Sequence, residues 1–188
     1  MNTRLLSGLV AAMAVLVGAC STTSGVTVAE KRQSVLNMRN AVLTELYKEK
    51  PDVQAQVNSA AGYAVFSNAN IHLLFAGVGG GHGVVRDNVT GQNTYMKMGE
   101  VGLGFGAGVK DVRLIFVFHT QSAMQRFVQS GWTFGGQAAA AAKASEKGGA
   151  LGAEAVVDDI TVYQLTASGL ALQATVKGTK FWRDQELN

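Results

Sequence analysis

The sequence predicts an α+β fold with a mainly antiparallel β-sheet or barrel-like core, an N-terminal amphipathic helix, and short helices packed on the sheet. Two observations predict this class. A helical pattern bounded by a capping box and a proline spans residues 27–51, and short apolar runs separated by turn residues follow from residue 62 onward. The chain has 188 residues, of which 47% are hydrophobic and 15% charged, so it can bury one core and is too apolar for a disordered protein.

The first residues have the features of a bacterial lipoprotein signal peptide. Arg4 supplies a positive charge, and Leu5 to Val17 form an apolar run that is too short to span a bilayer comfortably. The residues Val17-Gly18-Ala19-Cys20 that end it resemble the bacterial lipobox. This resemblance implies cleavage before Cys20 and attachment of a diacylglycerol to its thiol. The alternative is an ordinary signal peptide whose cleavage point happens to lie at a cysteine.

An acylated Cys20 would anchor the protein in a membrane. Ser21 follows it, and by resemblance to lipoprotein sorting in Gram-negative bacteria this residue favours the outer membrane over the inner one. Because Cys20 is the only cysteine, no disulfide within the chain is expected. We therefore predict a signal peptide at residues 1–19, an acylated tether at 20–27 and a folded domain at 28–188, anchored in the outer membrane and facing the periplasm or the cell surface.

A long helix is predicted from Thr27 to about Lys50. Thr27 and Glu30 have the spacing of a capping box, and Pro51 ends the helical pattern. Its apolar stripe consists of residues that recur at helical spacing, namely Val28, Val35, Leu36, Val42, Leu43 and Leu46.

Two arginines, Arg32 and Arg39, fall inside this apolar stripe. In one interpretation their stems pack on the core while the guanidinium groups reach solvent or a carboxylate. In the other, the guanidinium groups face lipid phosphates, and nearby lysines assist them. The second interpretation gives a set of predicted phospholipid-binding residues: Lys31, Arg32, Arg39, Lys48 and Lys50.

The rest of the chain reads as strands with two further helices. Between residues 101 and 109 glycine occupies every second position, so one face of that strand is bare backbone on which another element can lie closely. Short helices are predicted at Pro51–Ala60 and Thr120–Ser130, the second with Ser122 and Gln125 at capping-box spacing and Gly131 at its end. Strands are predicted at 62–66, 71–75, 84–87, 94–98, 101–109, 112–119, 153–157, 160–165 and 170–176, and a terminal cap at 181–187 in which Trp182 packs on the sheet.

Several of these segments together resemble the SYLF domain family. In order they are Gly62-Tyr63-Ala64-Val65-Phe66, Gly79-Gly80-Gly81-His82-Gly83-Val84-Val85, Leu114-Ile115-Phe116-Val117-Phe118, Tyr163 ahead of Ser168-Gly169-Leu170, and Gly178-Thr179. The resemblance covers about Val28 to Phe181 and implies an α+β domain that binds membrane phospholipids. It also implies a strand at Ala138–Ala144, where the alanine run by itself favours a helix.

No catalytic constellation is recognisable in the sequence. His72, His82 and His119 are far apart and lack partners at metal-binding spacing, and no G-x-S-x-G motif is present, so neither an enzyme nor a metal or other cofactor is expected. The glycine cluster Gly77–Gly83 lacks the Lys and Ser or Thr of a nucleotide loop. It is either a tight structural turn or a nest of backbone amides for a lipid headgroup, and Gly79, Gly80 and Gly81 are the candidate residues for that nest.

The combined prediction is a non-enzymatic, membrane-anchored lipoprotein whose domain binds anionic phospholipids. The net charge of +3 and pI of about 9.1 suit an anionic membrane surface but fall short of the dense basic patch typical of nucleic-acid binding. The alternative is a periplasmic scaffold that contacts other cell-envelope proteins and uses its lipid anchor only as a tether.

Overall fold

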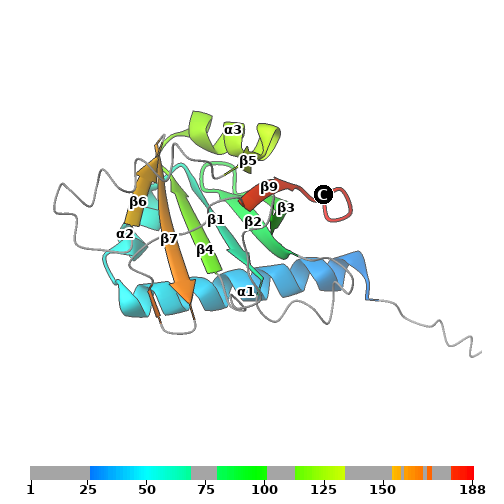
Figure 1. Cartoon of the computed structure of the whole chain (residues 1–188), viewed down its shortest axis with the longest axis horizontal. Helices are drawn as coiled ribbons and strands as arrows, with labels where there is room; N and C mark the ends of the chain where they lie inside the picture. The colour runs from blue at the N-terminus through cyan, green and yellow to red at the C-terminus, as the bar shows by residue number, and fades with distance from the viewer. Residues whose placement is uncertain are drawn as a thin grey trace, which may run out of the picture.

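The computed structural model describes residues 26–68, 80–100, 113–133, 154–157, 159–166, 169–170 and 179–188. Helices lie on both faces of an antiparallel sheet (Figure 1). One face carries α1 (Val28–Glu49) and α2 (Val53–Ser59), and the other carries α3 (Gln121–Ser130). The predicted α+β class, the antiparallel sheet and the N-terminal helix are confirmed.

Nine strands form this sheet in the described part of the chain. Their order is β5-β9-β3-β2-β1-β4-β7-β6, with β8 paired to β7, and every pair is antiparallel. Their bounds are β1 Gly62–Ser67, β2 Gly81–Asp87, β3 Asn93–Glu100, β4 Arg113–Phe118, β5 Trp132–Thr133, β6 Glu154–Val157, β7 Ile160–Thr166, β8 Gly169–Leu170 and β9 Thr179–Arg183.

Both faces of the central strands are buried, which explains their continuous apolar runs. In β1, Ala64 and Phe66 belong to the core cluster that includes α3, whereas Val65 between them belongs to the cluster that includes α1 and α2. Successive side chains of a strand point to opposite faces, so a strand covered on both sides needs an apolar residue at every position.

The N-terminus of α1 is set by the predicted capping box. The Thr27 hydroxyl accepts a hydrogen bond from the Glu30 amide (3.2 Å), and the Glu30 carboxylate accepts one from the Thr27 amide (2.7 Å). Of the predicted apolar stripe, Val35, Val42, Leu43 and Leu46 are buried, whereas Val28 is 38% exposed. The helix therefore packs on the sheet through its second to fifth turns, and its first turn lies beyond the core.

Helix α3 begins differently from the sequence prediction. Its N-cap is Thr120, whose extended backbone lets the hydroxyl accept a hydrogen bond from the Ala123 amide (3.3 Å). Ser122 is already inside the helix, so the predicted capping box of Ser122 and Gln125 is wrong. Gly131, with φ of 64°, ends the helix as predicted.

The C-terminal segment also corrects the sequence analysis. Residues predicted as a terminal cap begin as strand β9, between β3 and β5. Phe181 is fully buried against three other phenylalanines, whereas Trp182 is 36% exposed. Alternation along β9 places the two aromatic rings on opposite faces. Cys20, Gly79, the strand predictions at 71–75 and 101–109, and Ala138–Ala144 lie outside the described residues.

Candidate functional site: the cations of α1 and the C-terminal segment

Two of the predicted phospholipid-binding residues contact the C-terminal segment, defined here as residues 184–188. The Lys31 ammonium lies 2.5 Å from the Glu186 carboxylate. The Arg32 side chain donates a hydrogen bond from Nε to the Leu187 carbonyl oxygen (2.8 Å), and its guanidinium carbon is 5.7 Å from the centre of the Tyr95 ring. Neither predicted interpretation included this contact with a backbone carbonyl, and phospholipid binding by Arg32 stays a prediction.

The other three cations of the predicted set are distributed along α1 and just beyond it. Lys50 lies 2.5 Å from the Asp52 carboxylate. Half-buried Arg39 donates from Nε and Nη2 to the side-chain oxygen of Asn40 (3.1 and 2.9 Å), and Lys48 is exposed. Neither Arg39 nor Lys48 has a carboxylate within 4.0 Å among the described residues. The described structure thus does not bring the five residues together at one point.

The C-terminal segment is held against β3 and α1. The side chain of Asn188 pairs with the backbone of Tyr95 in both directions: its amide group donates to the Tyr95 carbonyl (2.8 Å), and its oxygen accepts from the Tyr95 amide (3.1 Å). The Asp184 amide donates to the same carbonyl (3.0 Å), and Leu187 is buried with Val35 and Val84. Local sequence patterns gave no signal for these contacts, because their partners are about ninety residues or more apart in the chain.

A buried polar cluster lies beneath this segment. It is formed by His82 on β2, Lys97 on β3 and Asp184. The Asp184 side chain is fully buried, lies 3.3 Å from the Lys97 ammonium through one oxygen, and accepts a hydrogen bond from the Glu186 amide (2.9 Å). His82 is 2% exposed, and its Nε2 lies 4.0 Å from the other Asp184 oxygen, which is too long for a hydrogen bond. The sequence analysis treated His82 as an isolated histidine and did not foresee this cluster.

Acid is expected to destabilise the protein through His82. Burial lowers the pKa of His82 from 6.5 to about 4, although the Asp184 charge opposes this shift. Between these pH values the unfolded chain binds the proton and the folded chain does not, so stability falls as the pH falls through this window. The expected loss is about 2 kcal/mol, less than the full shift would give, because Lys97 keeps this cluster in contact with solvent. Urea unfolding at pH 7 and pH 4 measures it, and a His82→Gln variant with the same pH dependence would contradict the assignment.

The two described members of the candidate headgroup nest lie at the start of β2. A side chain at Gly80 would overlap the carbonyl oxygen of Met98, and one at Gly81 would overlap the carbonyl oxygen of Ser67. Gly81 is paired in the sheet with Met98 of β3. Close approach of neighbouring strands therefore accounts for glycine at both positions, and headgroup binding there stays a prediction.

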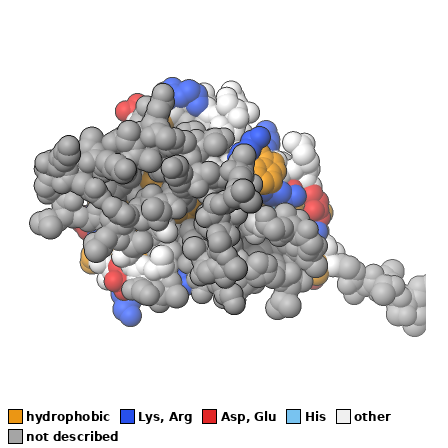
Figure 2. Space-filling model, in the orientation of Figure 1, with side chains coloured by type: hydrophobic (Ala, Val, Ile, Leu, Met, Phe, Trp, Pro, Cys, Tyr) orange, Lys and Arg blue, Asp and Glu red, His pale blue; other side chains and the backbone are white. Residues whose placement is uncertain are grey.

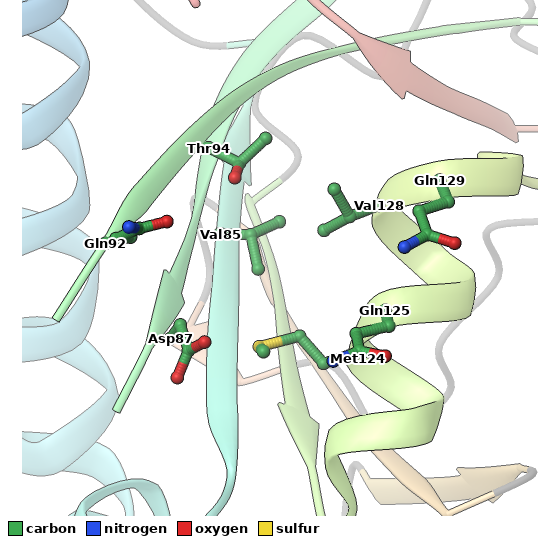
Figure 3. Close-up of a pocket in the computed structure, with 8 residues that line it drawn as sticks. All are labelled: Val85, Asp87, Gln92, Thr94, Met124, Gln125, Val128 and Gln129. Atoms are coloured by element: carbon green, nitrogen blue, oxygen red, sulfur yellow. The ribbon is translucent and has the colours of Figure 1, made fainter. Parts of the chain in front are cut away.

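A small pocket lies between α3 and the strands β2 and β3 (Figure 3). Its volume is about 130 Å³, and it is lined by Val85, Asp87, Gln92, Thr94, Met124, Gln125, Val128 and Gln129. Asp87 is the one titratable side chain in this lining, and it accepts hydrogen bonds from the amides of Val89 and Thr90 (2.8 and 3.1 Å). Asp87 thus stabilises the turn between β2 and β3, and the pocket lacks the converging acid and base of a hydrolytic site.

Within the described ranges, no group of three or more His, Cys, Asp or Glu side chains could hold a metal ion. His119 bonds to the hydroxyl of Thr161 through Nε2 (2.8 Å). In the described part of the chain, no helix is both long enough and apolar enough to cross a membrane.

Comparison with known proteins gave two matches. Residues 99–188 match the family model Ysc84, described as "Las17-binding protein actin regulator". The chain is also 30% identical over 168 residues to the Beta cell expansion factor A of Aeromonas veronii. That alignment covers 86% of this chain and 60% of the relative, so the chain spans less than two thirds of the relative's length.

Proposed function

Because residues 99–188 of this chain belong to the Ysc84 (SYLF) family, we propose that the protein is a non-enzymatic lipoprotein of the bacterial outer membrane whose domain binds anionic phospholipid at the membrane surface. The lipobox ending at Cys20 supports the anchor. The small pocket, with its single titratable side chain, supports a binding role in preference to catalysis.

One observation carries the lipid-binding proposal: the described residues include cations that no carboxylate among them neutralises. Arg39 and Lys48 on α1, and Lys180 and Arg183 on β9, have no carboxylate within 4.0 Å among the described residues. Each Lys or Arg close to an anionic bilayer contributes about 1 kcal/mol to binding, so a few such cations suffice for measurable attraction.

Vesicle flotation tests the proposal. The chain carrying Cys20→Ser, which has no thiol to acylate, is mixed with vesicles of phosphatidylcholine alone or of phosphatidylcholine with phosphatidylglycerol. We expect recovery with the anionic vesicles to exceed recovery with the neutral ones, and the excess to fall as salt is raised, because salt screens exposed charges. Equal recovery from both kinds of vesicle would contradict the proposal. The unsubstituted, acylated chain is the positive control and should float with both.

A second candidate function is a scaffold for other envelope proteins. It is favoured by the description of the matching family model, which names a protein partner for that family. Crosslinking in intact cells that returns one defined protein, together with no lipid preference in flotation, would favour this candidate.

A further inference from the structure

Exposed apolar side chains are concentrated at one end of the described structure. The large hydrophobic residues that remain exposed are Val26, Val28, Val89 and Trp182. Val26 and Val28 lie at the start of α1, and Trp182 lies on β9. Val89 is apart from them, in the turn whose Asn88 side chain donates a hydrogen bond to the Val57 carbonyl at the end of α2 (2.8 Å).

Basic side chains lie beside Trp182. Lys180 lies on the same face of β9 as Trp182, because the two residues alternate with buried Phe181. Lys97 of β3 is paired with Trp182 in the sheet. Arg183, the last residue of β9, is also exposed, but alternation places its side chain on the opposite face of the strand, with Phe181. Figure 2 shows Lys and Arg side chains next to an exposed hydrophobic side chain in the region where Figure 1 places β9 and β3. Trp side chains are enriched at the membrane–water interface, and Lys and Arg close to the surface are attracted to anionic headgroups.

This end of the molecule is also the end nearest the predicted anchor. Only five residues lie between Cys20 and Val26, and the six residue steps from one to the other span at most about 20 Å when fully extended. The contacts of Lys31 with Glu186 and of Arg32 with Leu187 bring the C-terminal segment, which directly follows β9, against the first turns of α1. Figure 1 shows the start of α1, β3, β9 and the C-terminus at the same end.

Arg39 and Lys48 on α1 are less well placed for this contact. Lys48 is twenty residues beyond Val28, which corresponds to about 30 Å along the helix axis. Arg39 is half-buried and occupies the side of α1 that carries Val35 and Leu43. Neither has a large exposed apolar neighbour on the helix, since the exposed ones on α1 lie at its start.

We propose that the domain contacts an anionic bilayer end-on through a docking patch made of Trp182 and Lys180 on one face of β9 and Arg183 on the other face at the end of the strand, with Val26 and Val28 at the same end of the molecule. Trp182 inserts at the interface, and the two cations contact headgroup phosphates. This proposal rests on the proposed lipid-binding function and names the surface that performs it. Pairing of β9 with both β3 and β5 holds the patch rigid before contact, so little ordering entropy is lost on binding.

Tryptophan fluorescence tests the insertion of Trp182. The chain has two tryptophans, so Cys20→Ser with Trp132→Phe leaves Trp182 as the sole emitter. Vesicles containing phosphatidylglycerol and brominated acyl chains are expected to shift its emission to the blue and to quench it, whereas brominated phosphatidylcholine vesicles leave it unchanged. The matched variant Trp182→Phe, which reports on Trp132, should show neither effect. If the vesicles bind the protein but the fluorescence of Trp182 is not quenched, the proposed docking patch is contradicted.

Two matched double variants separate the patch from α1 without relying on fluorescence. Each removes two cations that have no carboxylate within 4.0 Å in the part of the chain that the structure describes. Lys180→Gln with Arg183→Gln should weaken binding to anionic vesicles about 30-fold, whereas Arg39→Gln with Lys48→Gln should weaken it by less than about threefold, because charges beyond about 8 Å from the surface are screened.

The outcomes of these experiments are distinguishable. Anionic preference that is lost in the α1 pair and kept in the β9 pair would overturn the patch and leave the proposed function standing. Absence of any anionic preference in the parent chain overturns both. Crosslinking of a defined envelope protein to the patch, with no vesicle binding, would assign the surface to a protein partner and likewise overturn the proposal.

Discussion

Replacing Phe181 by Ala is expected to lower the free energy of unfolding by about 4 kcal/mol, because it removes a fully buried aromatic ring from the centre of the larger core cluster. The ring centre of Phe181 lies 4.8 Å from that of Phe66, 5.1 Å from that of Phe116 and 5.6 Å from that of Phe127. Loss of one ring leaves a cavity bordered by three rigid neighbours that cannot close over it. Urea unfolding followed by circular dichroism measures the change.

The neighbouring residue provides the matched control. Trp182→Ala changes the other aromatic residue of β9, which is 36% exposed, and should cost far less, about 1 kcal/mol. If the two variants lose similar stability, the side chains of β9 do not alternate as described. A small effect at Trp182 also matters for the proposed docking patch, because it allows this residue to be altered without unfolding the domain.

Asp184→Asn is expected to cost about 3 kcal/mol, although it preserves the shape of the side chain. The change leaves the Lys97 ammonium facing a buried site without its counter-charge, and it weakens the hydrogen bond that the Asp184 carboxylate accepts from the Glu186 amide. Because Asp184 is the first residue of the C-terminal segment, we also expect faster hydrogen exchange at the amides of residues 184–188 and of Tyr95. Denaturant unfolding and exchange measured by mass spectrometry report the two effects.

Asp52→Asn is the matched control for this charge. Asp52 has a comparable ion pair with Lys50, but its side chain is 69% exposed, so water replaces the lost partner. We expect no measurable shift of its denaturation midpoint. An Asp184 variant as stable as the Asp52 variant would show that burial of the Asp184–Lys97 pair adds nothing to stability.

The C-terminal segment changes how the basic residues of α1 are interpreted. One interpretation of their spacing grouped them as a lipid-binding set, yet Lys31 and Arg32 contact residues 186 and 187, and Lys50 contacts Asp52. Helical periodicity gives the angle of each side chain around α1, but it cannot reveal that a segment about 155 residues later in the chain lies against it. The cations that have no carboxylate partner among the described residues are therefore found partly on β9, where the sequence analysis expected only a cap.

The sequence by itself determined the local elements of this protein. The capping box of Thr27 and Glu30 fixed the start of α1, the apolar runs located β1, β4 and β7, and Gly131 ended α3, because each signal acts through neighbouring residues. Only the tertiary structure decided which of two adjacent aromatic residues in β9 is buried, and that His82, Lys97 and Asp184 form one cluster. The physical reason is that strand register and long-range docking choose which face of an element meets the core, and neither is recorded in local spacing.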